Sequence, residues 1–381
     1  MNEDTLDNFE PVAKIIVIGV GGAGNNAVNR MIEDEIKFVD FYVANTDKQA
    51  LSLWKAPHRV VLGESITNGL GAGGDPSVGK AAAEASEKEM REIVKGANMV
   101  FIAAGMGGGT GTGAAPVIAK YAKEEGCLTV AIVTRPFTFE GNRRTNYSID
   151  GLNELKQNVD SMIVVSNDKL LMNSGNLPIG KAFGDADKVL ADSVKTITDL
   201  ILRPAVINLD FADVRNVLKD SGIALIGFGT GSGEKRSEDA ALTALNCPLI
   251  EQSINGARRA ICHITCGPSV SLYECQDTVD KIIENSGGQL DLKFGVSIND
   301  QLSDEIMLSI IASHFTNDTI FAKTAAPQKS DANSFFNQRP TQMDSQPLFN
   351  KDLLKPQEEK KDNTLDEDSI IPDFLKDNWN L

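Results

Sequence analysis

Two glycine-rich segments contain the residues best suited to chemistry in this 381-residue sequence. Residues 19–26 read GVGGAGNN, and residues 105–113 read GMGGGTGTG. Each segment follows an apolar run and precedes a helical pattern. Glycine lets the backbone turn sharply and approach a phosphate, while the N-terminus of the next helix supplies free N–H groups and partial positive charge. We therefore predict two phosphate-binding turns.

The first segment taken alone leaves two kinds of nucleotide open. Its glycines match GxGxxG, and Asp47 lies 23 residues beyond Gly24, close to the spacing of the ribose-binding acid in dinucleotide folds. An NAD(P)-dependent oxidoreductase is therefore an alternative. The second segment favours a nucleoside triphosphate, because a dinucleotide domain needs only one such loop and a P-loop needs a Lys that these segments lack. A third glycine-rich stretch, residues 69–76, could close over the terminal phosphate.

The elements that must position these loops appear as periodic patterns. Near-continuous apolar runs alternating with helical patterns predict a doubly wound, mostly parallel α/β sheet with helices on both faces. The runs cover residues 15–18, 41–44, 60–62, 99–104, 128–133 and 162–165. Between Lys181 and Arg203, apolar residues recur at spacings of three and four, which predicts one long helix stopped by Pro204.

The rest of the chain predicts a second, smaller α+β domain and a tail. Strands are expected at 223–229, 260–265, 290–296 and 305–314, with helices near 238–245 and 274–285. From residue 324 the chain is polar and has few aliphatic residues, which predicts disorder. The predicted divisions are a flexible N-terminus (1–12), a nucleotide-binding domain (13–179), a central helix (180–203), a C-terminal domain (204–323), a disordered linker (324–368) and a terminal peptide (369–381).

Composition narrows the classes of function. The charge of 37 − 53 = −16 argues against a broad phosphate-binding surface of the kind that binds nucleic acid, so nucleic acid is not an expected partner. No apolar run approaches the roughly 18 residues of a membrane span, and the first residues are acidic and polar, so a cytoplasmic protein is expected. Five cysteines without a CxxC pair predict buried, reduced thiols, and three histidines without HExxH spacing predict no metal site.

Four ordered motifs carry a family resemblance. Residues 107–113 resemble the signature of the tubulin superfamily, and the motifs at 45–47, 135–141 and 208–214 resemble loops of its FtsZ family of bacterial cell-division GTPases. The resemblance covers residues 14 to 315. It implies a GTPase that binds GTP or GDP, polymerises head to tail and forms the division ring. It also implies Mg²⁺ held mainly by phosphates and water rather than by a protein cage.

The resemblance implies a role for each site residue. Phosphates would be held along the two glycine-rich loops, at Gly21, Gly22, Ala23, Gly24, Asn25, Gly109, Thr110 and Gly111. The ribose and its surroundings would be held by Glu140 and Arg144, with Thr138 nearby. Phe183 would stack on the base, and its edge would be read by Asn26, Asn167 and Asp187. A carboxylate at Asp187 suits guanine, because it accepts from both the ring N–H and the exocyclic amine.

The loop after the central helix is expected to carry the catalytic groups. Two carboxylates spaced three apart, Asp210 and Asp213, are typical of surface charge or helix capping on sequence grounds alone. The resemblance implies instead that they enter the nucleotide site of the next subunit and orient or activate the attacking water, assisted by Asn208. The long helix would then couple the base-binding residues to this loop as one rigid rod.

The C-terminal peptide resembles the family's docking segment. Residues Ile371 to Lys376 would bind membrane-tethering division proteins such as FtsA, which implies a mid-cell location. The residues after Lys376 include no basic cluster, so we expect membrane attachment to be indirect.

Overall fold

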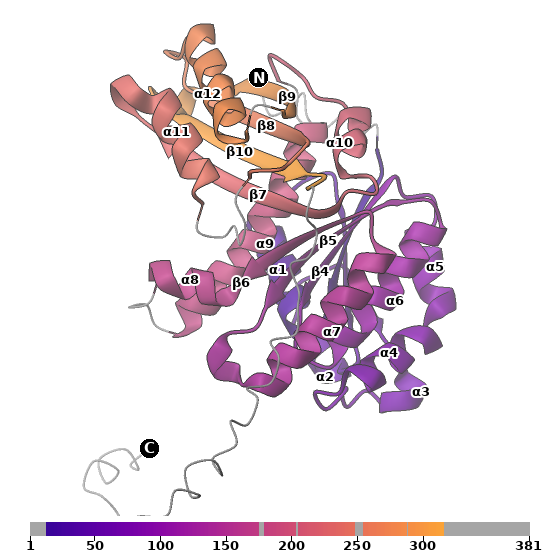
Figure 1. The fold of residues 1–381 in the computed structure, drawn as a ribbon. Helices are drawn as coiled ribbons and strands as arrows, with labels where there is room; N and C mark the ends of the chain where they lie inside the picture. The colour runs from indigo at the N-terminus through magenta and orange to yellow at the C-terminus, as the bar shows by residue number, and fades with distance from the viewer. Residues whose placement is uncertain (1–12, 175–178, 203–204, 248–253, 288, 316–381) are drawn as a thin grey trace, which may run out of the picture. The chain divides into compact units, whose positions relative to one another are not determined.

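The computed structural model describes residues 13–174, 179–202, 205–247, 254–287 and 289–315 (Figure 1), all within one compact unit. The predicted N-terminal segment (1–12), the helix stop at Pro204, the linker (324–368) and the terminal peptide (369–381) lie outside these residues. The domain boundaries therefore stay predictions.

A single ten-stranded sheet runs through the described residues. Its order is β3-β2-β1-β4-β5-β6-β7-β10-β8-β9. Neighbouring strands from β3 to β7 are parallel, β10 is antiparallel to both its neighbours, and β8 is parallel to β9. The strands are β1 (Ile15–Val20), β2 (Asp40–Asn45), β3 (His58–Val61), β4 (Met99–Gly105), β5 (Leu128–Arg135), β6 (Ser161–Ser166), β7 (Gly222–Gly231), β8 (Arg259–Cys266), β9 (Asp291–Ile298) and β10 (Ile306–Ser313).

The predicted doubly wound sheet is confirmed, and the alternation of its side chains explains the apolar runs. In β1, Ile15 and Val17 enter one buried cluster, whereas Ile16 and Ile18 enter another on the opposite face. Both faces of a central parallel strand are covered by helices, so neither set of side chains needs to be polar.

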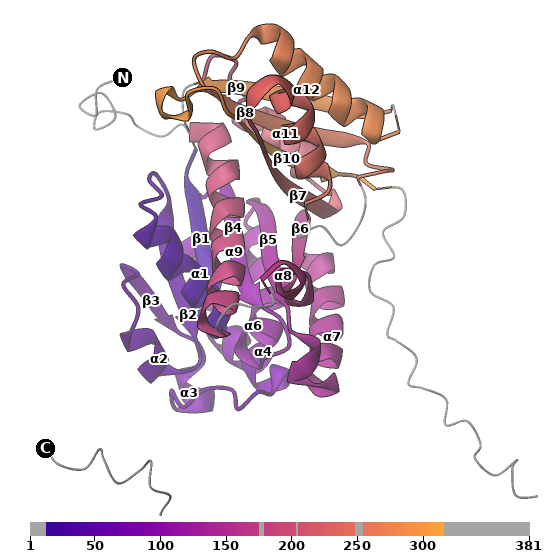
Figure 2. The same ribbon diagram turned by 90° about the vertical axis from the view of Figure 1, so that its left-hand side faces the viewer.

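Helices cover both faces of the parallel part of the sheet (Figure 2). One face packs against α1 (Gly21–Glu33), α2 (Lys48–Ser52), α9 (Ile179–Leu202) and α10 (Phe211–Leu218). The other packs against α4 (Pro76–Ala85), α5 (Glu87–Val94), α6 (Thr110–Glu124) and α7 (Asn142–Asn158). Two short helices, α3 (Glu64–Thr67) and α8 (Asn167–Ser174), lie in connections between these elements.

The strand β7 joins the parallel sheet to the antiparallel part. Its first residues pair with β6, and those from Leu225 to Gly231 pair with β10. A third buried cluster lies where α11 (Arg236–Leu245) and α12 (Leu272–Asn285) pack on β8, β9 and β10. All five cysteines are buried and free, as predicted. Short 3₁₀ turns complete the described elements: η2 (Thr138–Glu140), η3 (Gly233–Lys235) and η4 (Asp300–Leu302).

The long helix is confirmed as α9. Three of its predicted apolar positions, Leu190, Val194 and Ile197, are fully buried against the sheet. Its 24 residues span about 36 Å at the usual helical rise. This length separates the groups at its two ends.

Candidate functional site

The two glycine-rich loops touch each other at the carboxyl ends of β1 and β4. Gly21 begins α1 with a φ of 71°, and a Cβ placed there would lie 2.9 Å from the backbone nitrogen of Gly111. A side chain at Gly21 would therefore be strained and would push the two loops apart. The parallel strand order brings the loops together, because β1 and β4 are neighbours.

Side-chain hydroxyls hold the second loop in shape. The backbone N–H of Gly107 donates to Thr112 Oγ1 at 2.8 Å. The hydroxyl of Thr110, the first residue of α6, lies 2.7 Å from that of Thr46, which follows β2. The contact between the two hydroxyls ties the N-terminus of α6 to the end of β2.

A pocket of about 320 Å³ lies between the two helix N-termini. N–H groups at two helix starts, together with the aligned peptide dipoles, form a site for anions such as phosphates. Eleven of the predicted binding residues line it: Gly22, Ala23, Asn26, Gly109, Thr110, Gly111, Glu140, Arg144, Asn167, Phe183 and Asp187.

The opposite wall of the pocket offers hydrogen-bond acceptors. Burial raises the pKa of Asp187 to about 7, while a hydrogen bond from Asn26 and the charge of Arg30 act in the other direction. Asn167 is buried, and its Oδ1 has no hydrogen-bond partner among the described residues. The pocket is thus lined by two hydrogen-bond acceptors, Asn167 Oδ1 and the carboxyl group of Asp187.

Aromatic and charged groups shape the same wall. The ring of Phe183 is 41% exposed and meets Phe137 edge-on at 5.1 Å between centroids. Glu140 Oε1 accepts from the backbone N–H of Phe137 at 2.9 Å, and its other oxygen pairs with Arg144. Phe183 therefore has an exposed face for stacking, and Glu140 is held in one orientation.

Four predicted binding residues support the pocket without lining it: Gly21, Gly24, Asn25 and Thr138. With its amide nitrogen facing the first loop, buried Asn25 donates to the carbonyls of Gly19 (2.8 Å) and Gly21 (3.1 Å). A Cβ on Gly24 would lie 2.1 Å from the carbonyl oxygen of Ala103, so α1 packs directly on β4. Thr138 donates its N–H and its hydroxyl to Asp168 in α8, at 2.9 and 2.5 Å.

The predicted catalytic loop lies at the other end of α9. Asp210 caps α10, because its Oδ1 accepts a hydrogen bond from the backbone N–H of Asp213 at 2.8 Å. In turn, Asp213 Oδ2 accepts from the backbone N–H of Asp210 at 3.3 Å. Asn208 Oδ1 accepts from the N–H of Ala205 at 2.6 Å. An ion pair with Lys293 on β9 holds the pKa of Asp213 below its usual value. None of the three predicted catalytic residues lines the pocket described above.

Known proteins share this combination of fold and loops. A family described as Tubulin/FtsZ family, GTPase domain, matches residues 14–175, and one described as FtsZ family, C-terminal domain, matches residues 222–316. FtsZ from M. jannaschii, solved as an empty dimer, is 38% identical with a TM-score of 0.74, covering 81% of this chain and 90% of that chain. The chain belongs to the FtsZ family.

Two further solved structures share the fold of this chain. A mutant FtsZ from M. jannaschii is 39% identical with a TM-score of 0.75, covering 80% of this chain and 91% of its own. CetZ2 from Haloferax volcanii, solved as a GTPγS-bound protofilament, is 22% identical with a TM-score of 0.66, covering 78% and 92%, and shows the shared fold. Members of the tubulin/FtsZ family are cytoskeletal GTPases, and so is this FtsZ-family chain.

The assignment to the FtsZ family leaves the NAD(P)-dependent alternative without support. Neither matching family is an oxidoreductase family. Asp47, on which that alternative depended, uses its carboxylate to cap α2, accepting from the N–H groups of Gln49 (2.9 Å) and Ala50 (3.0 Å). Among the described residues, no helix is long and apolar enough to cross a membrane.

Several residues that line the pocket of this FtsZ-family chain were given no individual role from the sequence. The further lining residues are Gly105, Met106, Gly108, Thr134, Pro136 and Ala186. Gly105, Met106 and Gly108 belong to the second glycine-rich segment and Pro136 to the motif at 135–141, so only Thr134 and Ala186 lie outside the glycine-rich segments and motifs that the sequence singled out. Asp168 was missed because its partner Thr138 is 30 residues away, and only the pairing of β5 with β6 brings the two together.

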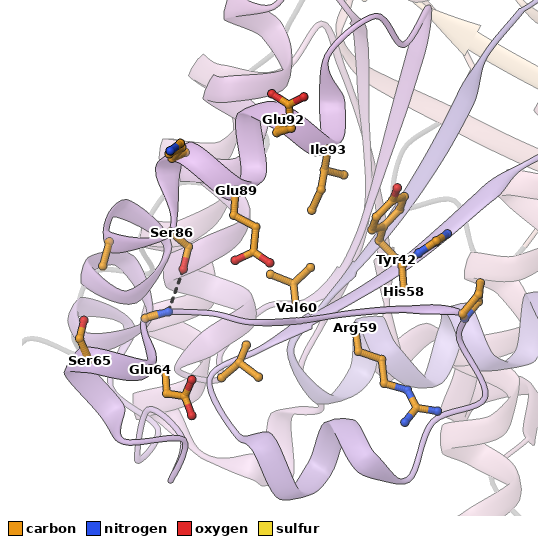
Figure 3. A pocket seen from close by; sticks show the side chains of 15 residues that line it. Tyr42, His58, Arg59, Val60, Glu64, Ser65, Ser86, Glu89, Glu92 and Ile93 are labelled. Atoms are coloured by element: carbon orange, nitrogen blue, oxygen red, sulfur yellow. Dashed lines mark hydrogen bonds between the residues drawn. The ribbon is translucent and has the colours of Figure 1, made fainter.

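A second hollow, of about 980 Å³, lies along the edge strand β3 (Figure 3). Tyr42, His58 and Val60 lie on the strand side, and Glu89 and Glu92 of α5 face them. It contains neither glycine-rich loop, and its charged lining residues have both signs: Glu64, Glu89 and Glu92 lie there with Arg59 and Lys88. The smaller pocket is the one that the two glycine-rich loops line, and it is the candidate nucleotide site of this FtsZ-family chain.

Proposed function

We propose that this chain binds GTP between its two glycine-rich loops, assembles head to tail into filaments, and hydrolyses GTP at each junction between subunits. The observation that carries the proposal is the distance between the nucleotide pocket and the proposed catalytic carboxylates, Asp210 and Asp213. Asp187 lies 15 residues before the end of α9, about 22 Å along the helix axis, and the carboxylates follow beyond that end. They cannot act on a nucleotide bound in the same subunit, so a neighbour must supply them.

Guanine fits the acceptors at the base end of the pocket. The carboxylate of Asp187 would accept from the ring N–H and the exocyclic amine together, and Asn167 Oδ1 needs a donor. Adenine lacks that pair of donors on one edge and would leave a buried carboxylate unpaired. The exposed face of Phe183 would stack on the base, and Glu140 and Arg144 would hold the ribose.

The phosphate end of the pocket fits a triphosphate with its metal. The residues there offer backbone N–H groups and the hydroxyl of Thr110, which are donors for phosphate oxygens. Mg²⁺ would be held mainly by those oxygens and by water, and it would offset negative charge on the transferred phosphoryl group.

Hydrolysis requires a water molecule in line with the terminal phosphate. Asp210 and Asp213 of the adjoining subunit would orient or activate that water, with Asn208 assisting. Both carboxylates already have fixed orientations, because each accepts a backbone N–H in the capping box of α10. Fixed acceptors lose little orientational freedom when the water arrives.

We propose the bacterial division ring, at mid-cell in the cytoplasm, as the setting of these filaments. Attachment to the membrane would be indirect, through division proteins such as FtsA that bind residues Ile371 to Lys376. That peptide lies outside the described residues, and the proposal for it depends on the sequence resemblance.

The substitution Asp210→Asn tests the catalytic assignment. Asn caps helices about as well as Asp, so α10 should keep its stability while the negative charge is lost. We expect unchanged GTP binding and sedimentation with GTP, and phosphate release lowered by about a hundredfold or more. Asp239→Asn, at an exposed position of α11, is the matched control and should behave as the wild type. Wild-type turnover in Asp210→Asn would contradict the proposal.

A further inference from the structure

The strand β9 forms the platform for the predicted catalytic loop. The backbone N–H groups of Val206 and Ile207 donate to the carbonyl of Val296 at 2.8 and 3.1 Å, and the N–H of Val296 returns a bond to Ile207. A Cβ placed on Gly295 would lie 3.2 Å from both the carbonyl oxygen of Ile207 and Leu209 Cδ1. The loop therefore lies directly against the face of β9 on which Gly295 is found.

Lys293 lies on that same face, two residues before Gly295, because side chains alternate along a strand. Its ammonium group pairs with Asp213 Oδ1. The contact is partly shielded from water, since the side chains of Lys293 and Asp213 are 36% and 24% exposed. In keeping with the pairing, the pKa of Asp213 is lowered and that of Lys293 is raised, chiefly by their mutual hydrogen bond. Asp291 and Asp210 also raise the pKa of Lys293.

Charge balance gives this pairing a role in the reaction. The proposed mechanism brings Asp210 and Asp213 toward a bound triphosphate, and like charges repel strongly where water is excluded. A cation attached to one of the carboxylates reduces that repulsion. It also fixes the carboxylate in one geometry, and misplacement of a positioned group by about 1 Å costs roughly a hundredfold in rate.

We propose that Lys293 is a positioning residue for GTP hydrolysis, which holds the carboxylate of Asp213 and carries a positive charge with the loop into the neighbouring subunit's phosphate site. This inference rests on the proposed function and adds a residue to it. Lys293 acts through Asp213 and is not itself assigned a contact with the nucleotide.

The first test compares turnover per assembled subunit in Lys293→Met and Lys293→Arg. Methionine keeps much of the length of the side chain without its charge, and arginine keeps the charge. We expect Lys293→Met to lose roughly tenfold or more in kcat with little change in GTP affinity, and Lys293→Arg to recover most of it. The control is Lys281→Met, which removes a lysine paired with Glu284 on α12 and should leave turnover unchanged.

The second test is a double-mutant cycle with Asp213→Asn. If Lys293 acts through Asp213, Lys293→Met has no further effect on the residual turnover of Asp213→Asn. The inference would be overturned if Lys293→Met lowered turnover by the same factor in the wild type and in Asp213→Asn. It would also be overturned if Lys293→Met alone had wild-type turnover. If thermal unfolding shows that Lys293→Met is unstable, Lys293→Gln replaces it in both tests, because glutamine keeps a hydrogen-bond donor without the charge. The same outcomes then support or overturn the inference.

The two proposals fail in different ways. Wild-type turnover in Asp210→Asn would contradict the proposed shared site itself. A loss of turnover in Asp210→Asn combined with wild-type turnover in Lys293→Met would remove only the role of Lys293.

Discussion

Burial changes the pKa of Asp187, which the sequence alone could not show. On a helical pattern an aspartate is ordinarily a solvated residue, and only the family resemblance gave it a role. The structure adds that the group is largely desolvated, so its pKa rises to about 7 from an ordinary value near 3.8. At neutral pH the free pocket thus holds a mixture of the acid and its carboxylate.

Guanine nucleotide affinity should accordingly fall as the pH falls through 7. Two donors on the base stabilise the carboxylate, so binding lowers the pKa of Asp187 and favours the deprotonated site. Between about pH 8 and about pH 6 we expect the affinity for GDP to fall roughly tenfold. Titration calorimetry at several pH values measures this. The nucleotide phosphates titrate too, so Asp187→Asn is the control; an equal slope in that variant would contradict the assignment.

Other residues at the site could not be predicted because their partners are distant in sequence. The sequence alone favoured surface charge or capping for Asp210 and Asp213, and the structure shows both in a capping box. Their catalytic role stays a prediction from the resemblance. Lys293 lies 80 residues from Asp213 and has no motif of its own. Only the register of β9 beneath the loop reveals their contact.

At the scale of elements, strands were easier to predict than the ends of helices. Strands buried on both faces appear as unbroken apolar runs, which is why β1, β4, β5 and β6 were predicted, whereas the apolar run expected at 60–62 overlaps only the last two residues of the edge strand β3. The helix α6 begins at Thr110, inside the second glycine-rich segment rather than after it. Glycine and threonine are weak helix formers, so the pattern gave no sign of this first turn. Thr110 and Gly111 of this first turn line the pocket.

Close packing of α6 on α4 predicts a large effect at Gly113. A Cβ there would lie 2.0 Å from the carbonyl oxygen of Pro76 and 2.6 Å from the nitrogen of Lys80, both backbone atoms of α4. Gly113→Ala should therefore lower the free energy of unfolding by about 1–3 kcal/mol. Gly180→Ala, at an exposed position of α9 with open space around it, should raise it by about 0.5–1 kcal/mol. Guanidinium denaturation measures both, and equal stability of the two variants would contradict this account of the packing.

The link between η2 and α8 makes a separate prediction about affinity. Asp168 accepts two hydrogen bonds from Thr138, and η2 also carries Glu140 of the pocket. Asp168→Ala should loosen η2 and weaken GTP binding about three- to tenfold, as expected for two partly exposed hydrogen bonds. Lys169→Ala, the next residue of α8, is the control. Unchanged affinity in Asp168→Ala, measured by calorimetry, would show that η2 is held by other contacts.

At the scale of the whole molecule, the arrangement of the site is asymmetric. The nucleotide pocket and the two carboxylates are separated by the length of most of α9, so the surfaces that would meet in a junction are different. A contact between unlike surfaces continues as an open filament when its rotation does not close into a ring. The sequence motifs indicated the family of this chain. The separation of the nucleotide pocket from the carboxylates depends on the long helix α9 and on the sheet against which it packs.

The most direct test of the shared site measures phosphate release per subunit against protein concentration, with sedimentation on the same samples. We predict very low turnover where GTP is bound but no polymer sediments, and a steep rise to a plateau as filaments form. Turnover per subunit that stays constant at its full value down to concentrations without polymer would contradict the account.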